Sequence, residues 1–211
     1  MPDQSHYFDT DPASPVRTRT LRVRLADRDV EVQSANAVFS GDRLDLGTSV
    51  LLREVPDPPE SGTLLDLGCG WGPIALSMAM LSESAQVVAV DVNRRSRELT
   101  ALNAEALVPG RITVAAPEDV DPATTFDAIW SNPPIRIGKP ALHELLMMWL
   151  PRLTPGGDAY LVVGRNLGAD SLQTWLTGAL GTPFEVTRHA SAKGFRVLRV
   201  HRHEVPPSDP A

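Results

Sequence analysis

A glycine-dense turn follows a short apolar run in the segment L-L-D-L-G-C-G-W-G-P, which covers residues 64–73. Gly68, Gly70 and Gly72 can adopt a positive φ, and without a Cβ they let the backbone approach a ligand closely. A helix that begins at Pro73 would also offer unpaired N–H groups to an anionic group. The segment therefore predicts a ligand-binding turn between a buried strand and a helix.

Two acidic residues accompany this turn. Asp66 precedes the glycines, and Asp91 ends the next apolar run, V-V-A-V. A carboxylate at the end of that strand can accept hydrogen bonds from both hydroxyls of a ribose. The glycines lack the G-x-G-x-x-G spacing that binds the pyrophosphate of a dinucleotide. The pattern therefore favours a nucleoside ligand of another class.

An asparagine followed by two prolines ends a later apolar run, in S-N-P-P-I at residues 131–135. An amino nitrogen conjugated to a ring or a carbonyl is a poor nucleophile because its lone pair is delocalised. A protein can orient that lone pair by accepting both N–H hydrogens. The side-chain oxygen of Asn132 and the carbonyl of Pro133, held rigid by the consecutive prolines, are two suitable acceptors. The motif predicts chemistry on a planar amino group.

The sequence D-L-G-C-G-W-G at residues 66–72 resembles the first motif of class I S-adenosylmethionine-dependent methyltransferases. The resemblance implies S-adenosyl-L-methionine as the cofactor, with Asp66 near the amino end of its methionine moiety and Asp91 on its ribose. It also implies a polar residue beyond the third strand, either Glu118 or Asp119, at the adenine amine. The implied cofactor residues are Asp66, Gly68, Cys69, Gly70, Gly72, Asp91, Glu118, Asp119 and Asn132.

The longer string N-P-P-I-R-I-G-K at residues 132–139 resembles a variant found among relatives of ribosomal RNA small subunit methyltransferase C, the guanine-N2 methyltransferases of 16S rRNA. H-Y-F at residues 6–8, L-D-L-G-T at 44–48 and K-G-F-R-V at 193–197 extend the likeness. Related families often stack an aromatic ring on the target from the position of Ile135, and Phe39 or Trp130 are alternatives here. The resemblance implies ribosomal RNA or the small ribosomal subunit as the partner. The implied catalytic residues are Asn132, Pro133, Pro134 and Ile135.

The chain carries 20 basic and 26 acidic residues, a net charge of −6, which argues against binding a polyanion over its whole surface. Basic residues nevertheless gather in an early arginine-rich segment, residues 17–28, and in residues 188–203. Phosphate contacts add affinity without specifying sequence. The candidate substrate-binding residues are Phe39, Arg136, Lys139, Arg165 and Lys193.

Apolar runs of four to six residues alternate with segments of helical period after Thr63, a pattern typical of a parallel sheet wrapped by helices. We expect an α/β, Rossmann-like class I methyltransferase fold: a mostly parallel seven-stranded sheet with an antiparallel C-terminal edge hairpin and a small N-terminal β-hairpin. The expected strands are 64–67, 86–91, 112–115, 128–131, 158–163, 184–188 and 195–201, and the expected helices are 48–55, 73–81, 95–106, 139–153 and 171–180. The expected division is an N-terminal extension over 1–60, with its hairpin at 20–33, a methyltransferase domain over 61–204 and a tail over 205–211.

Other features narrow the class of protein. The single cysteine, Cys69, excludes an internal disulfide and an all-cysteine metal cage. The histidines have no spacing typical of metal ligands, so no metal is expected. The longest apolar run, Leu145 to Leu150, is too short to span a membrane, and the N-terminal residues do not form a targeting signal. These observations predict a cytoplasmic enzyme.

Three functions fit the motifs. The first is S-adenosylmethionine-dependent methylation of guanine N2 in ribosomal RNA. The second is methylation of a protein glutamine at N5, because an amide nitrogen needs the same pair of acceptors. The third is a non-catalytic S-adenosylmethionine-binding module in ribonucleoprotein assembly, against which the presence of Asp66, Asp91 and Asn132 argues.

Overall fold

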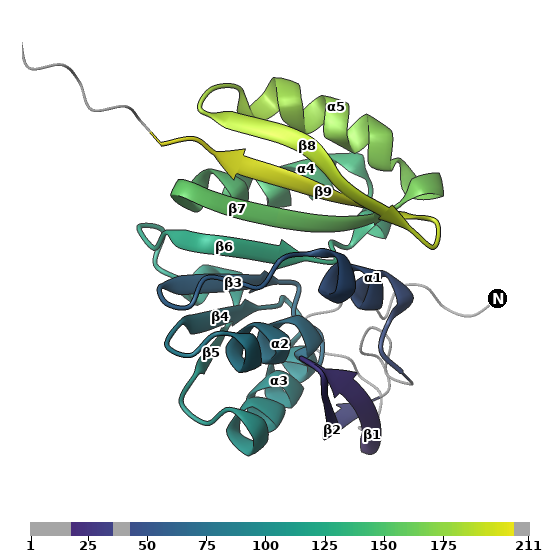
Figure 1. Ribbon diagram of the computed structural model, residues 1–211, viewed down its shortest axis with the longest axis vertical. Helices are drawn as coiled ribbons and strands as arrows, with labels where there is room; N and C mark the ends of the chain where they lie inside the picture. The colour runs from purple at the N-terminus through teal and green to yellow at the C-terminus, as the bar shows by residue number, and fades with distance from the viewer. Residues whose placement is uncertain (1–17, 36–42, 205–211) are drawn as a thin grey trace, which may run out of the picture.

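The computed structural model describes residues 18–35 and 43–204, and its main feature is one seven-stranded sheet in the order β5-β4-β3-β6-β7-β9-β8 (Figure 1). Strand β9 runs antiparallel to both neighbours, β7 and β8, while the pairs from β5 to β7 are all parallel. The predicted fold class is confirmed. The strands are β3 (Thr63–Leu67), β4 (Gln86–Val90), β5 (Ile112–Ala115), β6 (Phe126–Ser131), β7 (Leu153–Gly164), β8 (Phe184–Ala192) and β9 (Phe195–Arg202).

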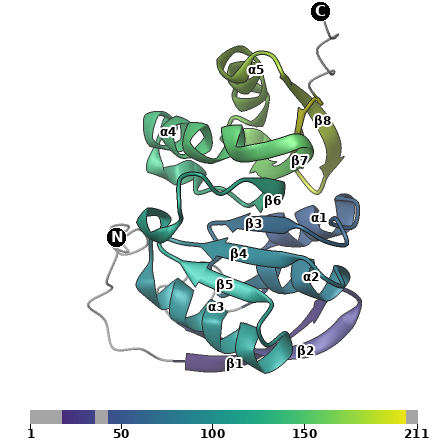
Figure 2. The same cartoon turned by 90° about the vertical axis from the view of Figure 1, so that its left-hand side faces the viewer.

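Helices cover both faces of this sheet (Figure 2). They are α1 (Leu46–Glu54), α2 (Pro73–Leu81), α3 (Arg94–Leu107), α4 (Lys139–Trp149) and α5 (Ala169–Leu180). Buried side chains of α1 and α2 pack on one face, and those of α4 and α5 pack on the other. Apolar residues at helical spacing thus line the core, as their period predicts. Across residues 18–35 and 43–204, no helix combines the length and apolarity needed to cross a membrane.

Three predicted boundaries are wrong by four residues or more. The helix expected over 139–153 ends at Trp149, and a 3-10 turn over Leu150–Arg152 follows, because Pro151 has no N–H with which to continue the α-helix. Strand β7 begins at Leu153, five residues before the expected start. Strand β8 continues to Ala192 through a register shift between Arg188 and Ala190. The core elements nevertheless lie where the apolar periods predict them.

The predicted N-terminal hairpin is present as β1 (Thr18–Leu25) and β2 (Arg28–Ala35). Its two-residue turn places Ala26 and Asp27 at positive φ, as hairpin turns of this length require. Its apolar side chains pack with residues of α2 and α3. The hairpin is therefore attached next to the helices that follow β3 and β4.

Candidate active site

The carboxyl ends of β3, β4, β5 and β6 meet at one edge of the sheet, where open α/β sheets bind ligands. At this edge the N–H of Asp91 donates to the carbonyl of Ala115 (3.4 Å), and the hydroxyl of Ser131 donates to the carbonyl of Leu67 (2.6 Å). The structure therefore brings together the glycine turn after β3, Asp91 after β4 and Asn132 after β6, as the motifs predict.

The three glycines of the turn have different roles. Gly68, Gly70 and Gly72 all have positive φ, at 84°, 58° and 97°. A Cβ on Gly68 or Gly70 would meet no described atom within 4 Å, so these two leave open space beside the turn. A Cβ on Gly72 would lie 3.1 Å from Cγ2 of Thr100 on α3. Gly68 and Gly70 can therefore admit a ligand, whereas Gly72 lets the turn pack against α3.

Backbone hydrogen bonds hold the turn to the end of β4. The N–H groups of Gly68 and Cys69 both donate to the carbonyl of Val90, at 2.8 and 3.0 Å. The N–H of Gly70 donates to Oδ2 of Asp91 (3.0 Å), whose Oδ1 accepts from the N–H of Asn93 (2.8 Å). Asp91 is thus fixed beside the turn before any ligand arrives.

Asp66 lies under the turn and is fully buried. Its Oδ2 accepts from the N–H of Ala75 (2.9 Å), and its Oδ1 has no hydrogen-bond partner among the described residues. Burial raises the pKa of Asp66 to about 8, the N–H of Ala75 opposes this shift, and the charge of Asp91 adds to it. Burial also raises the pKa of Asp91. A ligand with hydrogen-bond donors or a positive charge suits this pair of desolvated carboxyl groups.

Cys69 and Trp71 are both buried and border the cavity beside the glycine turn. Cys69 is buried, and burial raises the pKa of its thiol well above the ordinary value, so the reactive thiolate is disfavoured. Its sulfur accepts a hydrogen bond from the hydroxyl of Thr100 (3.4 Å). Trp71 is 1% exposed and belongs to the core between the hairpin, α2 and α3. Neither residue is placed to act as a nucleophile or a lid.

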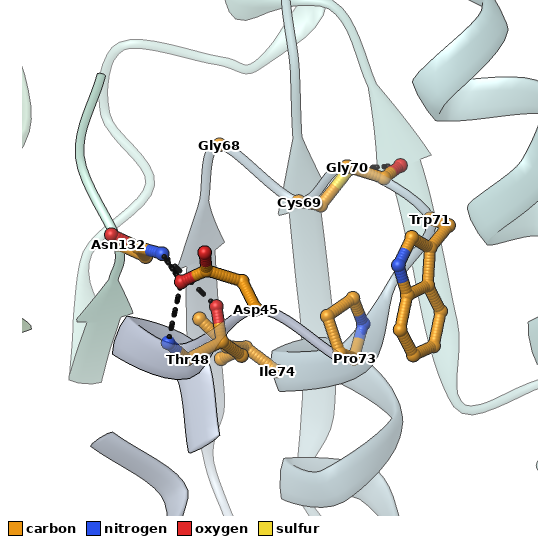
Figure 3. Close-up of a pocket in the computed structure, with 9 residues that line it drawn as sticks. All are labelled: Asp45, Thr48, Gly68, Cys69, Gly70, Trp71, Pro73, Ile74 and Asn132. Carbon is orange, nitrogen blue, oxygen red and sulfur yellow. Dashed lines mark hydrogen bonds between the residues drawn. The ribbon is translucent and has the colours of Figure 1, made fainter. Parts of the chain in front are cut away.

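Asn132 lies opposite the glycine turn, across a cavity that also borders Asp45 and Thr48 (Figure 3). Its amide nitrogen donates to Oδ2 of Asp45 (2.8 Å) and to the hydroxyl of Thr48 (3.1 Å). Asp45 and Thr48 come from the start of α1, far away in the sequence. They were not among the predicted site residues, although the segment L-D-L-G-T that contains them supported the family resemblance.

The prolines after Asn132 form a tight turn. The N–H of Ile135 donates to the carbonyl of Pro133 (2.8 Å) across Pro134, whose φ of −75° and ψ of 73° define an inverse γ-turn. The carbonyl of Pro133 has a second lone pair, so it retains the capacity to accept from a substrate. Ile135 is half-buried against the core on the α4 face.

Of the two aromatic residues expected as alternatives to Ile135, neither is described at the site. Phe39 lies outside the described residues, and Trp130 is 1% exposed because its position on β6 points into the core. Phe195, at the start of β9, is half-buried beside Asn132. A Cβ on Gly47 would lie 3.0 Å from Cε1 of Phe195 and 3.4 Å from Nδ2 of Asn132. Phe195 was not among the predicted site residues, although the segment K-G-F-R-V that contains it supported the family resemblance.

The candidate cations divide into two pairs. Arg165 and Lys193 line a second cavity of about 200 Å³ together with Phe195. The N–H of Arg165 also donates to the carbonyl of Gly194 (2.8 Å), which fixes the β8–β9 turn against the end of β7. Arg136 and Lys139 are exposed and follow Asn132 in the chain.

The two candidates for the adenine amine, Glu118 and Asp119, are both exposed on a 3-10 turn (Pro117–Asp119) beyond β5.

Two arginines of the hairpin are paired with acids. Arg22 contacts Glu31 at 2.8 Å, and Arg24 contacts Asp27 at 3.3 Å. These pairs neutralise part of the positive charge that the sequence places on β1. Arg188 and Arg196 of the second basic segment likewise pair with Asp170, at 3.5 and 2.6 Å, so acid pairing does not distinguish the two basic segments.

The chain is similar to known proteins in sequence and in fold. The family model described as the methyltransferase small domain matches residues 29–199. Protein YbxB of Bacillus subtilis, whose name gives no activity, is 33% identical over 79% of this chain and 84% of its own length. Ribosomal RNA small subunit methyltransferase C of Pseudomonas entomophila is 33% identical over 90% of this chain and 57% of its own length.

Among solved structures, the T. thermophilus 16S rRNA N2 methyltransferase RsmC, in complex with AdoMet and guanosine, aligns with a TM-score of 0.72 at 24% identity. The alignment covers 90% of this chain and 52% of that one. The chain thus spans about half of the two named RNA methyltransferases. The family resemblance predicted from the motifs is confirmed.

Proposed function

This chain belongs to the methyltransferase small domain family, whose methyl donor is S-adenosylmethionine, and we propose that it methylates the exocyclic N2 of a guanine in 16S ribosomal RNA. The observation that carries the proposal is the position of Asn132. Its amide lies across one cavity from the glycine turn, with the amide nitrogen already bonded to Asp45 and Thr48. This arrangement supports a role for Asn132 as the acceptor for an amino group beside the turn that would bind the cofactor.

The residues around the glycine turn fit S-adenosylmethionine. Gly68 and Gly70 leave open space beside the backbone, Asp91 stands at the end of β4 for the ribose hydroxyls, and Asp66 offers an unpartnered buried oxygen among the described residues. Either Glu118 or Asp119 on the turn after β5 would meet the adenine amine. The bound cofactor supplies an electrophilic methyl group on a positively charged sulfur.

The residues after β6 would prepare the amine. The oxygen of Asn132 and the carbonyl of Pro133 accept its two hydrogens, so that the nitrogen lone pair is directed away from the ring system. The surplus proton leaves to solvent once the nitrogen is alkylated. Phe195, half-buried beside Asn132, would supply a flat apolar face for a planar base. An aromatic ring face suits guanine better than the narrow side chain of a glutamine.

The cations near this site would bind the RNA backbone. Arg165 and Lys193 share the second cavity with Phe195, so a phosphate held there would lie close to a base on that ring. Arg136 and Lys139 extend the positive charge along the segment after Asn132. A base inside a duplex would have to be splayed out to reach Asn132. The names of the RNA methyltransferase relatives support ribosomal RNA as the substrate.

The test is methyl transfer with isotope-labelled S-adenosylmethionine. Unmodified small ribosomal subunits and the RNA stripped from them are incubated with the protein, and the labelled nucleosides are identified by mass spectrometry. Labelled N2-methylguanosine is expected from one or both preparations, and the Asn132→Ala variant is the control. Label in a protein glutamine, or tight cofactor binding without turnover on either preparation, would overturn the proposal and support the corresponding alternative.

A further inference from the structure

We infer that Asp45 is a positioning residue that, together with Thr48, fixes the amide of Asn132 so that its oxygen is presented to the substrate amine. The inference rests on the proposed function for the role of Asn132. The arrangement of the three side chains is independent of that role (Figure 3). Asp45 would not contact the reacting atoms and would act only through Asn132.

The chemistry of the contacts determines the orientation of the amide. An ionised carboxylate accepts hydrogen bonds and cannot donate them, so the atom of Asn132 that faces Oδ2 of Asp45 must be the nitrogen. The second N–H of the same nitrogen is taken by the hydroxyl of Thr48. With both N–H groups engaged, the planar amide turns its oxygen away from Asp45 and Thr48, as Figure 3 shows.

Asp45 is itself held by the start of α1. Its Oδ2 also accepts from the N–H of Thr48 (3.0 Å), which makes it the N-cap of the helix. The helix is anchored by Val50 and Leu51, both fully buried. Because Asp45 caps a packed helix, the position of its carboxylate is fixed independently of its contact with Asn132.

Gly47 makes room for this arrangement. A Cβ at this position would lie 2.9 Å from Oδ2 of Asp45, closer than Cβ atoms approach other atoms in proteins. It would also lie 3.0 Å from Cε1 of Phe195. Asp45, Asn132 and Phe195 can therefore converge only because residue 47 has no side chain.

Without the carboxylate of Asp45, the remaining contact with the Thr48 hydroxyl does not distinguish the nitrogen of the Asn132 amide from its oxygen, because a hydroxyl can both donate and accept. An amide rotated by 180° would present its N–H groups to the N–H groups of the substrate, and methyl transfer would slow. A misplacement of about 1 Å can cost about 100-fold in rate. We expect the loss to fall on kcat, with the affinity for cofactor unchanged.

Asp45→Ser and Asp45→Asn form a matched pair for the test. Serine and asparagine both cap helices well, so α1 is retained in each. Serine is too short to reach Asn132, whereas the oxygen of asparagine can replace Oδ2. We expect Asp45→Ser to lower kcat about 10- to 100-fold and Asp45→Asn to recover most of it, with cofactor Kd within about twofold in both, since the inference places no cofactor contact on Asp45.

Thr48 gives a second pair that leaves the helix cap intact. Thr48→Val removes the hydroxyl at nearly constant volume, and Thr48→Ser retains it. Thr48→Val should lower kcat less than Asp45→Ser does, because the charged partner remains. Thr48→Ser should be closer to the unaltered protein. If Asp45→Ser fails to fold, this pair still tests whether the neighbours of the Asn132 amide fix its orientation.

A measurement that needs no turnover separates this inference from the proposed function. The side-chain amide signals of Asn132, assigned by their loss in Asn132→Ala, are followed by 15N NMR. They should show slow hydrogen exchange in the unaltered protein and fast exchange in Asp45→Ser. Fast exchange of these signals in both proteins, or an equal kcat in the two, would overturn the inference that Asp45 fixes the amide of Asn132. A rise in cofactor Kd with unchanged kcat would also overturn it, by making Asp45 a cofactor ligand. Protected signals in a protein that methylates no substrate would instead reject only the proposed function.

Discussion

The sheet divides between β3 and β6 into two halves that prepare their ligand sites differently (Figure 1). In the half formed by β3, β4 and β5, the site consists of backbone and carboxyl groups. The glycine turn is bonded to the end of β4, and Asp66 and Asp91 are desolvated enough that burial raises the pKa of both. This half is organised by strand ends that are neighbours in space.

In the other half, the site depends on side chains from three distant segments. Asn132 follows β6, its amide partners Asp45 and Thr48 come from the start of α1, and Phe195 comes from β9. Exposed cations, Arg165 and Lys193, stand at the end of this half. We therefore expect the two halves to respond separately to mutation, one through cofactor affinity and the other through turnover and RNA binding.

The largest expected effect is that of Asn132→Ala on turnover. The variant removes the acceptor for the substrate amine, so kcat should fall about 100- to 1,000-fold, the loss typical of removing one preorganised polar group from an active site. Cofactor Kd, measured by calorimetry, should change by less than about threefold. A large rise in Kd at normal kcat would show that the two halves are not separable.

The corresponding change in the other half is Asp91→Ala. It removes the carboxylate expected to bind both ribose hydroxyls, and hydrogen bonds to charged groups contribute about 1.5 to 3 kcal/mol each. Cofactor Kd should therefore rise at least about tenfold, while kcat at saturating cofactor stays within about threefold. The same titration of Glu118→Ala and Asp119→Ala would identify which of these residues meets the adenine. An unchanged Kd in Asp91→Ala would contradict the assigned role.

A third prediction concerns the dependence of stability on pH. Because the pKa of Asp66 is raised to about 8 in the folded protein, the folded state binds more protons than the unfolded state above the ordinary carboxyl pKa. This residue should therefore lower the free energy of unfolding by about 1.4 kcal/mol per pH unit as pH rises toward 8. Urea unfolding at several pH values should give a shallower decline for Asp66→Asn. Equal slopes in the two proteins would show that Asp66 is ionised in the folded state.

The half formed by β3, β4 and β5, where the cofactor is proposed to bind (the cofactor half), was largely predictable from the sequence. Asp66, the glycines and Asp91 lie within one strand–turn–helix–strand unit, so their spacing alone places them at one edge of a parallel sheet. The helix over Pro73–Leu81 was predicted with its observed ends, because a glycine turn and a proline mark its start. Local signals were sufficient where the contacts are between consecutive elements.

The half from β6 to β8, where the substrate is proposed to bind, was predictable only in part. Asn132 was found from its motif, but no local pattern shows that the cap of α1 reaches it, or that β9 brings Phe195 beside Gly47. The pairing of hairpin arginines with acids across β1 and β2 depends on strand register, which charge counting ignores. Contacts between elements distant in the chain depend on tertiary packing that sequence periodicity does not specify.

The smallest expected effect is on RNA affinity. Lys193→Asn removes one charge from the second cavity and suits the positive φ of 47° at this position, because asparagine tolerates that conformation. If Lys193 contacts one phosphate, the variant should bind ribosomal RNA a few-fold more weakly and lower the slope of log K against log salt by about one. Arg24→Gln is the control, since Arg24 is paired with Asp27 on the hairpin and should leave both quantities unchanged. Equal losses in the two variants would mean that RNA is attracted by charge over the whole surface, and a loss only in Arg24→Gln would move the RNA to the cofactor half.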